Sequence, residues 1–223
     1  MFKKTIRNLR AIWNLILTPS NYRADYWHSL VKSNRENTPP LPWMNYKVIQ
    51  YLENQIRDPA HVFEYGSGSS TEYWLNNGCI VTSIEHNRDF YLEMIKKLGN
   101  RCQYLLIEPQ PMQRSDDESV DSPDSFKSSD FHGFSFEEYV KSIDEFENET
   151  FDMVIVDGRA RPSCIKRALP KIKRQGILVL DNSDRGHYLS KTHILLNEWP
   201  RKTFKGTVRG LLHHEETSVF HKP

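Results

Sequence analysis

The 223-residue chain has little cysteine, no long apolar run and almost no net charge. Its three cysteines, Cys79, Cys102 and Cys164, lack CxxC spacing, and the first two lie in apolar, strand-like runs, so we expect buried, reduced thiols and a cytoplasmic protein. No segment reaches the ~18–20 apolar residues that a membrane span needs. With 30 basic against 29 acidic residues and only short basic runs, the composition does not predict a nucleic-acid partner.

Residues 2–17 have the apolar spacing of an amphipathic helix. Phe2, Ile6, Leu9, Trp13 and Ile16 would share one face. Asn14 interrupts the apolar part and no small-residue cleavage site follows, which argues against a signal peptide. The stripe suits burial against protein, in this chain or in a partner, or contact with a membrane surface. The general rule that such stripes bury in protein favours the first interpretation.

The chain divides at a cluster of helix breakers, 37–42, which ends an N-terminal helical extension of residues 1–42 containing a second helix over 21–32. From residue 43 to 223 we expect one α/β domain that begins with a helix over 44–56, after which strands alternate with helices. Strands are predicted at 61–65, 79–85, 102–107, 151–157 and 176–181. Helices are predicted at 70–77, 88–98, 136–146 and 163–173. This order predicts a parallel sheet covered on both faces.

Two further segments depart from that alternation. After residue 187 the pattern predicts a helix to Trp199 and then strands over 202–208 and 217–221, which would add an antiparallel hairpin to the sheet. Residues 115–130 contain six acidic residues and one lysine among many serines, so we expect a mobile loop. It could be a solvated linker or a lid over an active site, and the composition favours the linker.

A glycine-containing turn follows the first predicted strand. It reads Glu64-Tyr65-Gly66-Ser67-Gly68-Ser69 and opens into a helix, so the backbone can turn sharply and approach a ligand closely. The second strand ends in Glu85, nineteen residues after Gly66, where a carboxylate could accept hydrogen bonds from ribose hydroxyls. The combination predicts nucleotide-type binding.

The position of a third glycine decides which nucleotide is expected. A dinucleotide fingerprint has a third glycine at the position where this chain has Thr71. That glycine lets the helix pack closely, so that the helix N-terminus meets the pyrophosphate. S-adenosylmethionine has no phosphate, so its binding would not need that glycine. In the order of these motifs the chain resembles the class I S-adenosylmethionine-dependent methyltransferases over residues 43–223. The resemblance implies a Rossmann-like sheet with a closing antiparallel pair and cofactor binding by Glu64, Gly66, Gly68, Ser69 and Glu85.

Other segments extend the resemblance to a poorly characterised bacterial group within that superfamily. They are the Pro-Trp-x-x-Tyr entry at 42–46, Phe63 to Thr71, Ser83 to His86, Val156 to Arg159 and Leu180 to Arg185. The resemblance implies that Trp43 and Tyr46 help to close the cofactor pocket. Both aromatic residues could equally pack the first helix of the domain on the sheet.

Acidic and amide side chains close the fourth and fifth predicted strands. Asp157, Asp181 and Asn182 would meet at the carboxyl edge of the sheet, and Mg²⁺ prefers such oxygen ligands. The pattern is similar to catechol, caffeoyl-coenzyme-A and sugar O-methyltransferases, which implies a divalent metal held by these three residues. A lysine base of the catechol type is missing, because Ala160 stands at its position. Asp157 and Asn182 could instead orient the acceptor or the backbone without metal.

The proton acceptor in such a reaction could be His187, which follows the fifth-strand motif, with His86 and His132 as further candidates. We therefore assign catalytic roles to Asp157, Asp181 and His187, and expect methyl transfer to an oxygen of a small polyol, sugar or glycan. A nitrogen or protein acceptor, bound by Asp181 and Asn182, is the main alternative. A non-catalytic S-adenosylmethionine-binding module acting through residues 1–17, and an NAD-dependent oxidoreductase, are less favoured.

Overall fold

The computed structural model describes residues 2–31, 39–57, 59–112 and 119–223, with side chains from residue 8 onward. Its centre is a seven-stranded sheet in the order β3-β2-β1-β6-β7-β9-β8. The parallel strands are β1 (His61–Tyr65), β2 (Ile80–Glu85), β3 (Gln103–Leu106), β6 (Phe151–Val156) and β7 (Ile172–Asp181). The antiparallel hairpin of β8 (Arg201–Thr207) and β9 (His214–His221) pairs with β7 through β9. The predicted α/β sheet with a terminal hairpin is confirmed.

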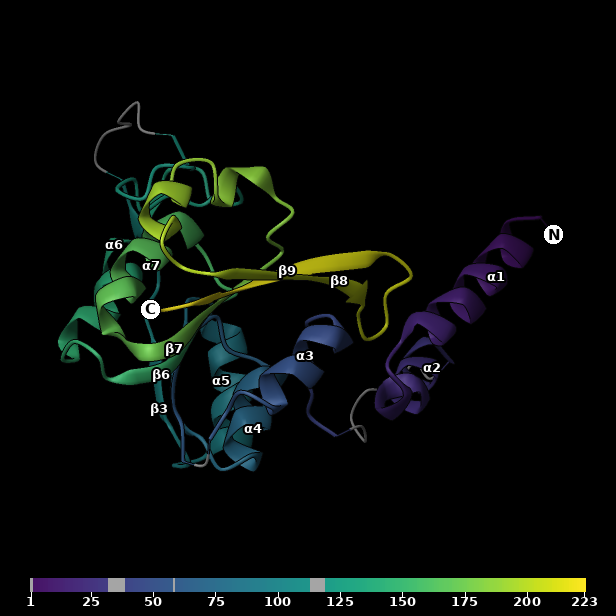
Figure 1. Cartoon of the computed structure of the whole chain (residues 1–223). Coiled ribbons are helices and arrows are strands. Elements are labelled where there is room, and N and C mark those ends of the chain that lie inside the picture. The colour runs from purple at the N-terminus through teal and green to yellow at the C-terminus, as the bar shows by residue number, and fades with distance from the viewer. Residues whose placement is uncertain (1, 32–38, 58, 113–118) are drawn as a thin grey trace.

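Side chains of the central strands alternate between two apolar layers, as buried strands require. In β6, Val154 and Val156 join the layer under α6 (Glu137–Lys141) and α7 (Arg161–Ala168). Met153 and Ile155 join the opposite layer under α3 (Tyr46–Glu53) and α4 (Ser69–Asn76). Near the sheet edge, α5 (Arg88–Leu98) packs on β2 and β3. Figure 1 shows the helices on both sides of the sheet.

The N-terminal residues form α1 (Phe2–Leu17), a 3₁₀ turn over Ser20–Tyr22, and α2 (Arg23–Val31). Tyr22 stacks on Tyr46 of α3 with ring centroids 5.2 Å apart, and Tyr26 meets the same ring edge-on. The Tyr46 hydroxyl donates to Asp25, 2.7 Å away. These contacts attach α2 to the sheet layer. The C-terminal end of α1 contacts α2 and β8, and the helix extends from there away from the sheet (Figure 1). No helix among the described residues is long and apolar enough to cross a membrane.

The chain after β6 departs from the predicted boundaries. The helix predicted over 163–173 runs from Arg161 to Ala168, becomes a 3₁₀ turn over Leu169–Lys171, and is followed at once by β7. Pro170 explains the early end, because proline lacks the N–H that a continuing helix needs. The strand predicted from 176 therefore starts at Ile172, with an irregular register before Ile177.

Two other predicted helices are shorter than expected. The one over 136–146 is α6 followed by a 3₁₀ turn, Ser142–Glu145, and the one over 187–199 is two 3₁₀ turns, Gly186–Tyr188 and His193–Leu196. Side chains compete for backbone carbonyls in the latter region, since Thr192 Oγ1 donates to the Tyr188 carbonyl and His193 Nδ1 lies 2.8 Å from the Ser190 carbonyl. The sequence pattern did not predict the short antiparallel pair of β4 (Gln110–Pro111) and β5 (Phe134–Ser135).

Candidate active site

The turn after β1 lies where the strand order reverses. β2 pairs on one side of β1 and β6 on the other, so the carboxyl ends of β1 and β6 border the crevice in which open α/β sheets bind ligands. Gly66 has φ +92°, and a Cβ there would stand 2.8 Å from the Gly158 Cα. A Cβ on Gly158 would stand 2.0 Å from the Tyr139 hydroxyl. Both glycines are therefore required for the close approach of the two strand ends.

Gly68 and Ser69 begin α4. Around Gly68 a Cβ would meet only Ser70 Oγ, at 3.9 Å, so the space beside its backbone is open. The Gly68 N–H donates to Thr71 Oγ1, and the Ser69 hydroxyl donates to the Leu41 carbonyl at 2.7 Å. Thr71, which replaces the third glycine of the dinucleotide fingerprint, thus caps its own helix. Ser69 holds the segment around Leu41 at the start of the domain. The space beside Gly68 is open and could accommodate a ligand.

Glu64 is fully buried beneath this turn. Its Oε2 accepts hydrogen bonds from Thr71 Oγ1 and from Ser83 Oγ at 3.0 Å, whereas its Oε1 has no hydrogen-bond partner among the described residues. Burial raises the pKa of Glu64 to about 7, although the hydrogen bonds from Thr71 and Ser83 oppose the rise. The carboxyl group therefore stabilises the turn through Oε2, and Oε1 has no hydrogen bond from the described residues.

Glu85 lies at the end of β2 beside the same turn. Its Oε1 accepts from the backbone N–H groups of His86 and Asn87, and its Oε2 accepts from Ser67 Oγ at 2.7 Å. Burial alone would raise the pKa of Glu85, but the hydrogen bonds from His86, Asn87 and Ser67 lower it below its ordinary value. An ionised carboxylate has about four acceptor sites, so Oε2 retains capacity for a further donor.

These features fit S-adenosylmethionine. Gly68 leaves space at the N-terminus of α4, and Glu85 is an ionised acceptor with a lone-pair site to spare for a ribose hydroxyl. The structure brings the five predicted cofactor residues together around one turn, namely Glu64, Gly66, Gly68, Ser69 and Glu85. Ser67 and Tyr104, whose hydroxyls lie 2.7 Å apart, complete the cluster and were not predicted.

A buried arginine joins the carboxyl ends of β6 and β7, where the sequence predicts that the methyl acceptor binds. We call these strand ends the acceptor edge. Arg161, in the first turn of α7, donates from Nη2 to Asp157 Oδ1 at 2.9 Å and from Nη1 to the Asp181 carbonyl. Its remaining contacts are with the Gly158 and Asp157 carbonyls and the Tyr188 ring. Burial and the neighbouring Asp181 raise the pKa of Asp157, and the Arg161 charge opposes that rise. One guanidinium thereby binds the ends of β6 and β7 to each other.

This arrangement does not support the predicted metal site at Asp157, Asp181 and Asn182. Asp157 is already paired with the Arg161 cation, and Asp181 Oδ1 accepts from Thr217 Oγ1 at 2.6 Å. Asn182 has φ +49° in the turn after β7, a conformation that asparagine adopts more readily than most residues. Across the described ranges no group of three or more histidine, cysteine, aspartate or glutamate side chains could hold a metal ion. Arg161 places a positive charge beside Asp157, and its i,i+4 spacing from Asp157 is the signal by which the sequence could have indicated this pair.

His187 lies on the same edge, in the 3₁₀ turn after β7. It lines a hollow of about 10 Å³ together with Gly158 and Arg161. Its Nε2 is buried and lacks a hydrogen-bond partner within the described part of the chain. Burial, followed by the charges of Arg185 and Arg161, lowers the pKa of His187 below its ordinary value. The imidazole is therefore neutral near pH 7, with a nitrogen available to accept a proton.

The acidic segment covers this hollow. Residues 113–118 lie outside the described ranges, but in 119–130 Asp121 pairs with Lys191, Asp124 with Lys166 and Asp130 with Arg159. Phe126 packs against the core, and Val120, Lys127, Ser128 and Ser129 line the hollow opposite His187. The described part of the segment is thus packed onto the acceptor edge, as a lid would be, and does not resemble a solvated linker.

The other candidate residues lie elsewhere. The His86 ring contacts Phe131, Phe136 and Tyr139, with Nδ1 3.0 Å from Glu85, and His132 is exposed. Tyr46 is fully buried against the N-terminal extension, which supports the packing interpretation over a role in the cofactor pocket. The Trp43 indole donates to the Arg209 carbonyl at 3.1 Å.

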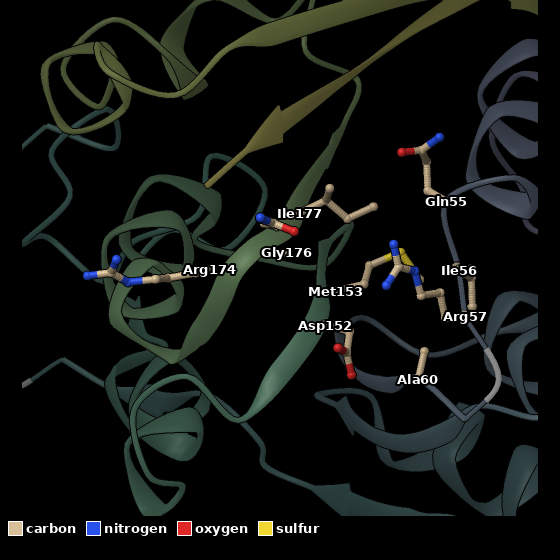
Figure 2. A pocket seen from close by; sticks show the side chains of 10 residues that line it. Gln55, Ile56, Arg57, Ala60, Asp152, Met153, Arg174, Gly176 and Ile177 are labelled. Atoms are coloured by element: carbon tan, nitrogen blue, oxygen red, sulfur yellow. The ribbon is translucent and has the colours of Figure 1, made fainter. Parts of the chain in front are cut away.

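A separate cavity of about 320 Å³ opens at the opposite, amino-terminal edge of the sheet (Figure 2). It lies between the chain after α3 and the starts of β6 and β7, and Figure 2 shows Arg174 pointing away from Arg57 and Met153. Asp152 on its wall accepts from the His61 N–H and from Lys173. None of its described lining side chains has a buried polar atom without a partner, so this cavity has no feature of a catalytic site.

Comparison with known proteins identifies the fold. No protein-family model and no curated protein matches the chain. An O-methyltransferase from Bacillus cereus, solved with S-adenosylhomocysteine, superposes with a TM-score of 0.58 at 13% identity over 90% of this chain and 97% of that one. The O-methyltransferase TomG from Streptomyces achromogenes, solved with S-adenosylmethionine, gives 0.55 at 16% identity over 90% and 96%. A methyltransferase-like protein from Silicibacter pomeroyi gives 0.53 at 20% identity over 82% and 88%.

Two of these similarities extend over 90% of this chain, and the third extends over 82%. The chain therefore has the fold of the class I S-adenosylmethionine-dependent methyltransferases.

Proposed function

We propose that the protein is an S-adenosylmethionine-dependent methyltransferase that acts on a hydroxyl group of a small polyol, sugar or glycan. The observation that carries the proposal is the placement of His187. A neutral imidazole with a free, buried Nε2 lies on the edge where Arg161 and Gly158 border the crevice. The similar O-methyltransferases from Bacillus cereus and Streptomyces achromogenes support the choice of an oxygen acceptor.

S-adenosylmethionine would supply the methyl group from its sulfonium centre. Glu85 would accept hydrogen bonds from the ribose, and Gly66 and Gly68 would let the backbone lie close to the ligand. His187 would take the proton of the acceptor hydroxyl at Nε2 while the carbon–sulfur bond breaks and the carbon–oxygen bond forms. Because Nε2 is buried, residues 119–130 must move before an acceptor can reach it.

The contacts of the two aspartates disfavour the nitrogen-acceptor alternative. Binding an amine at this edge would need an accessible carboxylate, but Asp157 is paired with Arg161 and Asp181 is 2% exposed. A non-catalytic binding module would have no need of an unpartnered base beside the crevice. A metal at Asp157 would displace Arg161 from that carboxylate. The buried Arg161 guanidinium would then have lost its counter-ion, which is energetically costly.

The test is a transfer assay with methyl-labelled S-adenosylmethionine and two matched acceptor panels, sugars and polyols against amines and peptides. We expect label in the hydroxyl panel, full activity after extensive chelation, and a loss of ~10²–10⁴-fold in His187→Gln, the range for a removed general base. The matched control is His132→Gln, an exposed histidine, which should retain activity. Transfer only to amines would contradict the oxygen acceptor, and loss of activity on chelation with return on adding Mg²⁺ would restore the metal alternative.

A further inference from the structure

The N-terminal helix is attached to the domain by its polar side. Asn14 and Thr18 are 5% and 1% exposed. Asn14 Nδ2 donates to the Tyr26 hydroxyl and to the Leu212 carbonyl, and Thr18 Oγ1 lies 2.7 Å from Thr207 Oγ1. A surface helix of a globular protein normally does the reverse, turning its apolar stripe to the core.

The opposite side of α1 is apolar and uncovered. Leu9, Trp13 and Ile16 are 61%, 62% and 58% exposed, and Ile12 is 50% exposed. Trp27 of the neighbouring α2 is also exposed. The part of the predicted stripe for which side chains are described is thus not buried in this chain. An exposed apolar patch of this kind marks a site of contact with a membrane or with another protein.

The N-terminal segment carries charge of one sign. The first 24 residues contain the basic residues Lys3, Lys4, Arg7, Arg10 and Arg23 and no acidic residue. The first acidic residue, Asp25, is neutralised by an ion pair with Arg209. Beside α1, a hollow of about 480 Å³ is lined by the two basic residues Arg10 and Lys205 among others. Basic residues near an apolar helical face attract anionic headgroups, and tryptophan is enriched at the membrane interface.

We propose that α1 docks on an anionic phospholipid bilayer, with Leu9, Ile12, Trp13 and Ile16 inserted at the headgroup boundary and Arg10 beside the lipid phosphates. The helix would lie in the interface without crossing the bilayer. A protein partner is the less favoured occupant, because an exposed apolar stripe with tryptophan, on a segment whose charges are all basic, matches an anionic lipid surface in both respects. Binding there would position the sheet beside the membrane independently of its chemistry.

The test is co-sedimentation of the full chain with vesicles of phosphatidylcholine alone and of phosphatidylcholine with 30% phosphatidylglycerol. We expect binding to the anionic vesicles to be at least about tenfold tighter and to weaken in high salt. Trp13→Ser should reduce it by about tenfold or more, because a large apolar side chain is no longer buried. Ile194→Ser is the matched control, since Ile194 is 65% exposed but lies far along the chain in the 3₁₀ turn His193–Leu196, and it should bind as the wild type does.

Sedimentation velocity without lipid separates the other occupants. A monomer that binds anionic vesicles through Trp13 supports the proposal. A wild-type chain that binds neither vesicle would overturn it, as would a dimer that dissociates in Trp13→Ser, because the face would then be an interface between copies. Equal loss of binding in Ile194→Ser would also overturn it, by showing that the apolar contact is nonspecific. Thermal melting of each variant verifies that it is folded.

Discussion

At the scale of one residue, the proposed chemistry depends on His187, whose buried Nε2 has no hydrogen-bond partner among the described residues and whose pKa is lowered by burial. Protonation below that pKa would remove the base, so the rate should fall as the pH decreases, with the midpoint below pH 6.5. A pH profile of kcat/KM for the wild type and for His187→Gln tests this. We expect the acidic limb in the wild type and its absence from the residual activity of the variant; the same limb in both proteins would assign the titration to another group.

Glu64 makes a separate prediction about stability. Its pKa is about 7 in the folded chain, against an ordinary value of 4.5, so the folded state holds the proton more tightly than the unfolded state. This contribution to stability is fully present below pH 4.5 and is lost as the pH rises through 7, with a magnitude on the order of 3 kcal/mol. Urea unfolding at pH 5 and pH 8 should show a smaller pH dependence in Glu64→Gln than in the wild type. Equal dependence would mean that Glu64 is not the titrating group.

At the scale of elements, Arg161 joins the ends of β6 and β7. Arg161→Met would remove the counter-ion of the half-buried Asp157 and the donor to the Asp181 carbonyl, so we expect a loss of about 1–3 kcal/mol in the free energy of unfolding, measured with urea. Arg161→Lys keeps the charge but cannot reach both strand ends at once, so its loss should be smaller. A stable Arg161→Met protein would show that the ion pair does not hold these ends together.

The sequence could predict what depends on local pattern. Apolar alternation located the five parallel strands and the hairpin, and the turn from Glu64 to Ser69 was predicted to lie beside Glu85, as it does in the fold. The sequence also placed Asp157 and Asp181 at one edge, but it could not predict that Arg161 joins them, since Asp181 lies 20 residues from Arg161 and only the fold brings them together. The periodicity of α1 likewise located a stripe correctly, but the orientation of the helix depends on Asn14 contacts with Tyr26 and Leu212, which are distant in sequence.

At the scale of the whole molecule, the crevice proposed for the cofactor lies at the carboxyl edge of the sheet, and the uncovered apolar face belongs to α1 in the N-terminal extension. Both follow from the same chain topology. The strand order reverses at β1, which opens the crevice beside Gly66, and α2 anchors the extension to α3 so that α1 projects from the domain (Figure 1). The crevice is the part on which the proposed function depends.

The most direct test of the central claim is calorimetric titration of the full chain with S-adenosylhomocysteine and with NAD. The account predicts one S-adenosylhomocysteine site, no NAD binding, and an affinity about 10- to 100-fold lower in Glu85→Gln, which corresponds to the loss of about 1–3 kcal/mol for an unmatched polar partner. Glu93→Gln, on the exposed side of α5, is the matched control and should bind as the wild type does. Binding of NAD without binding of S-adenosylhomocysteine would contradict the account.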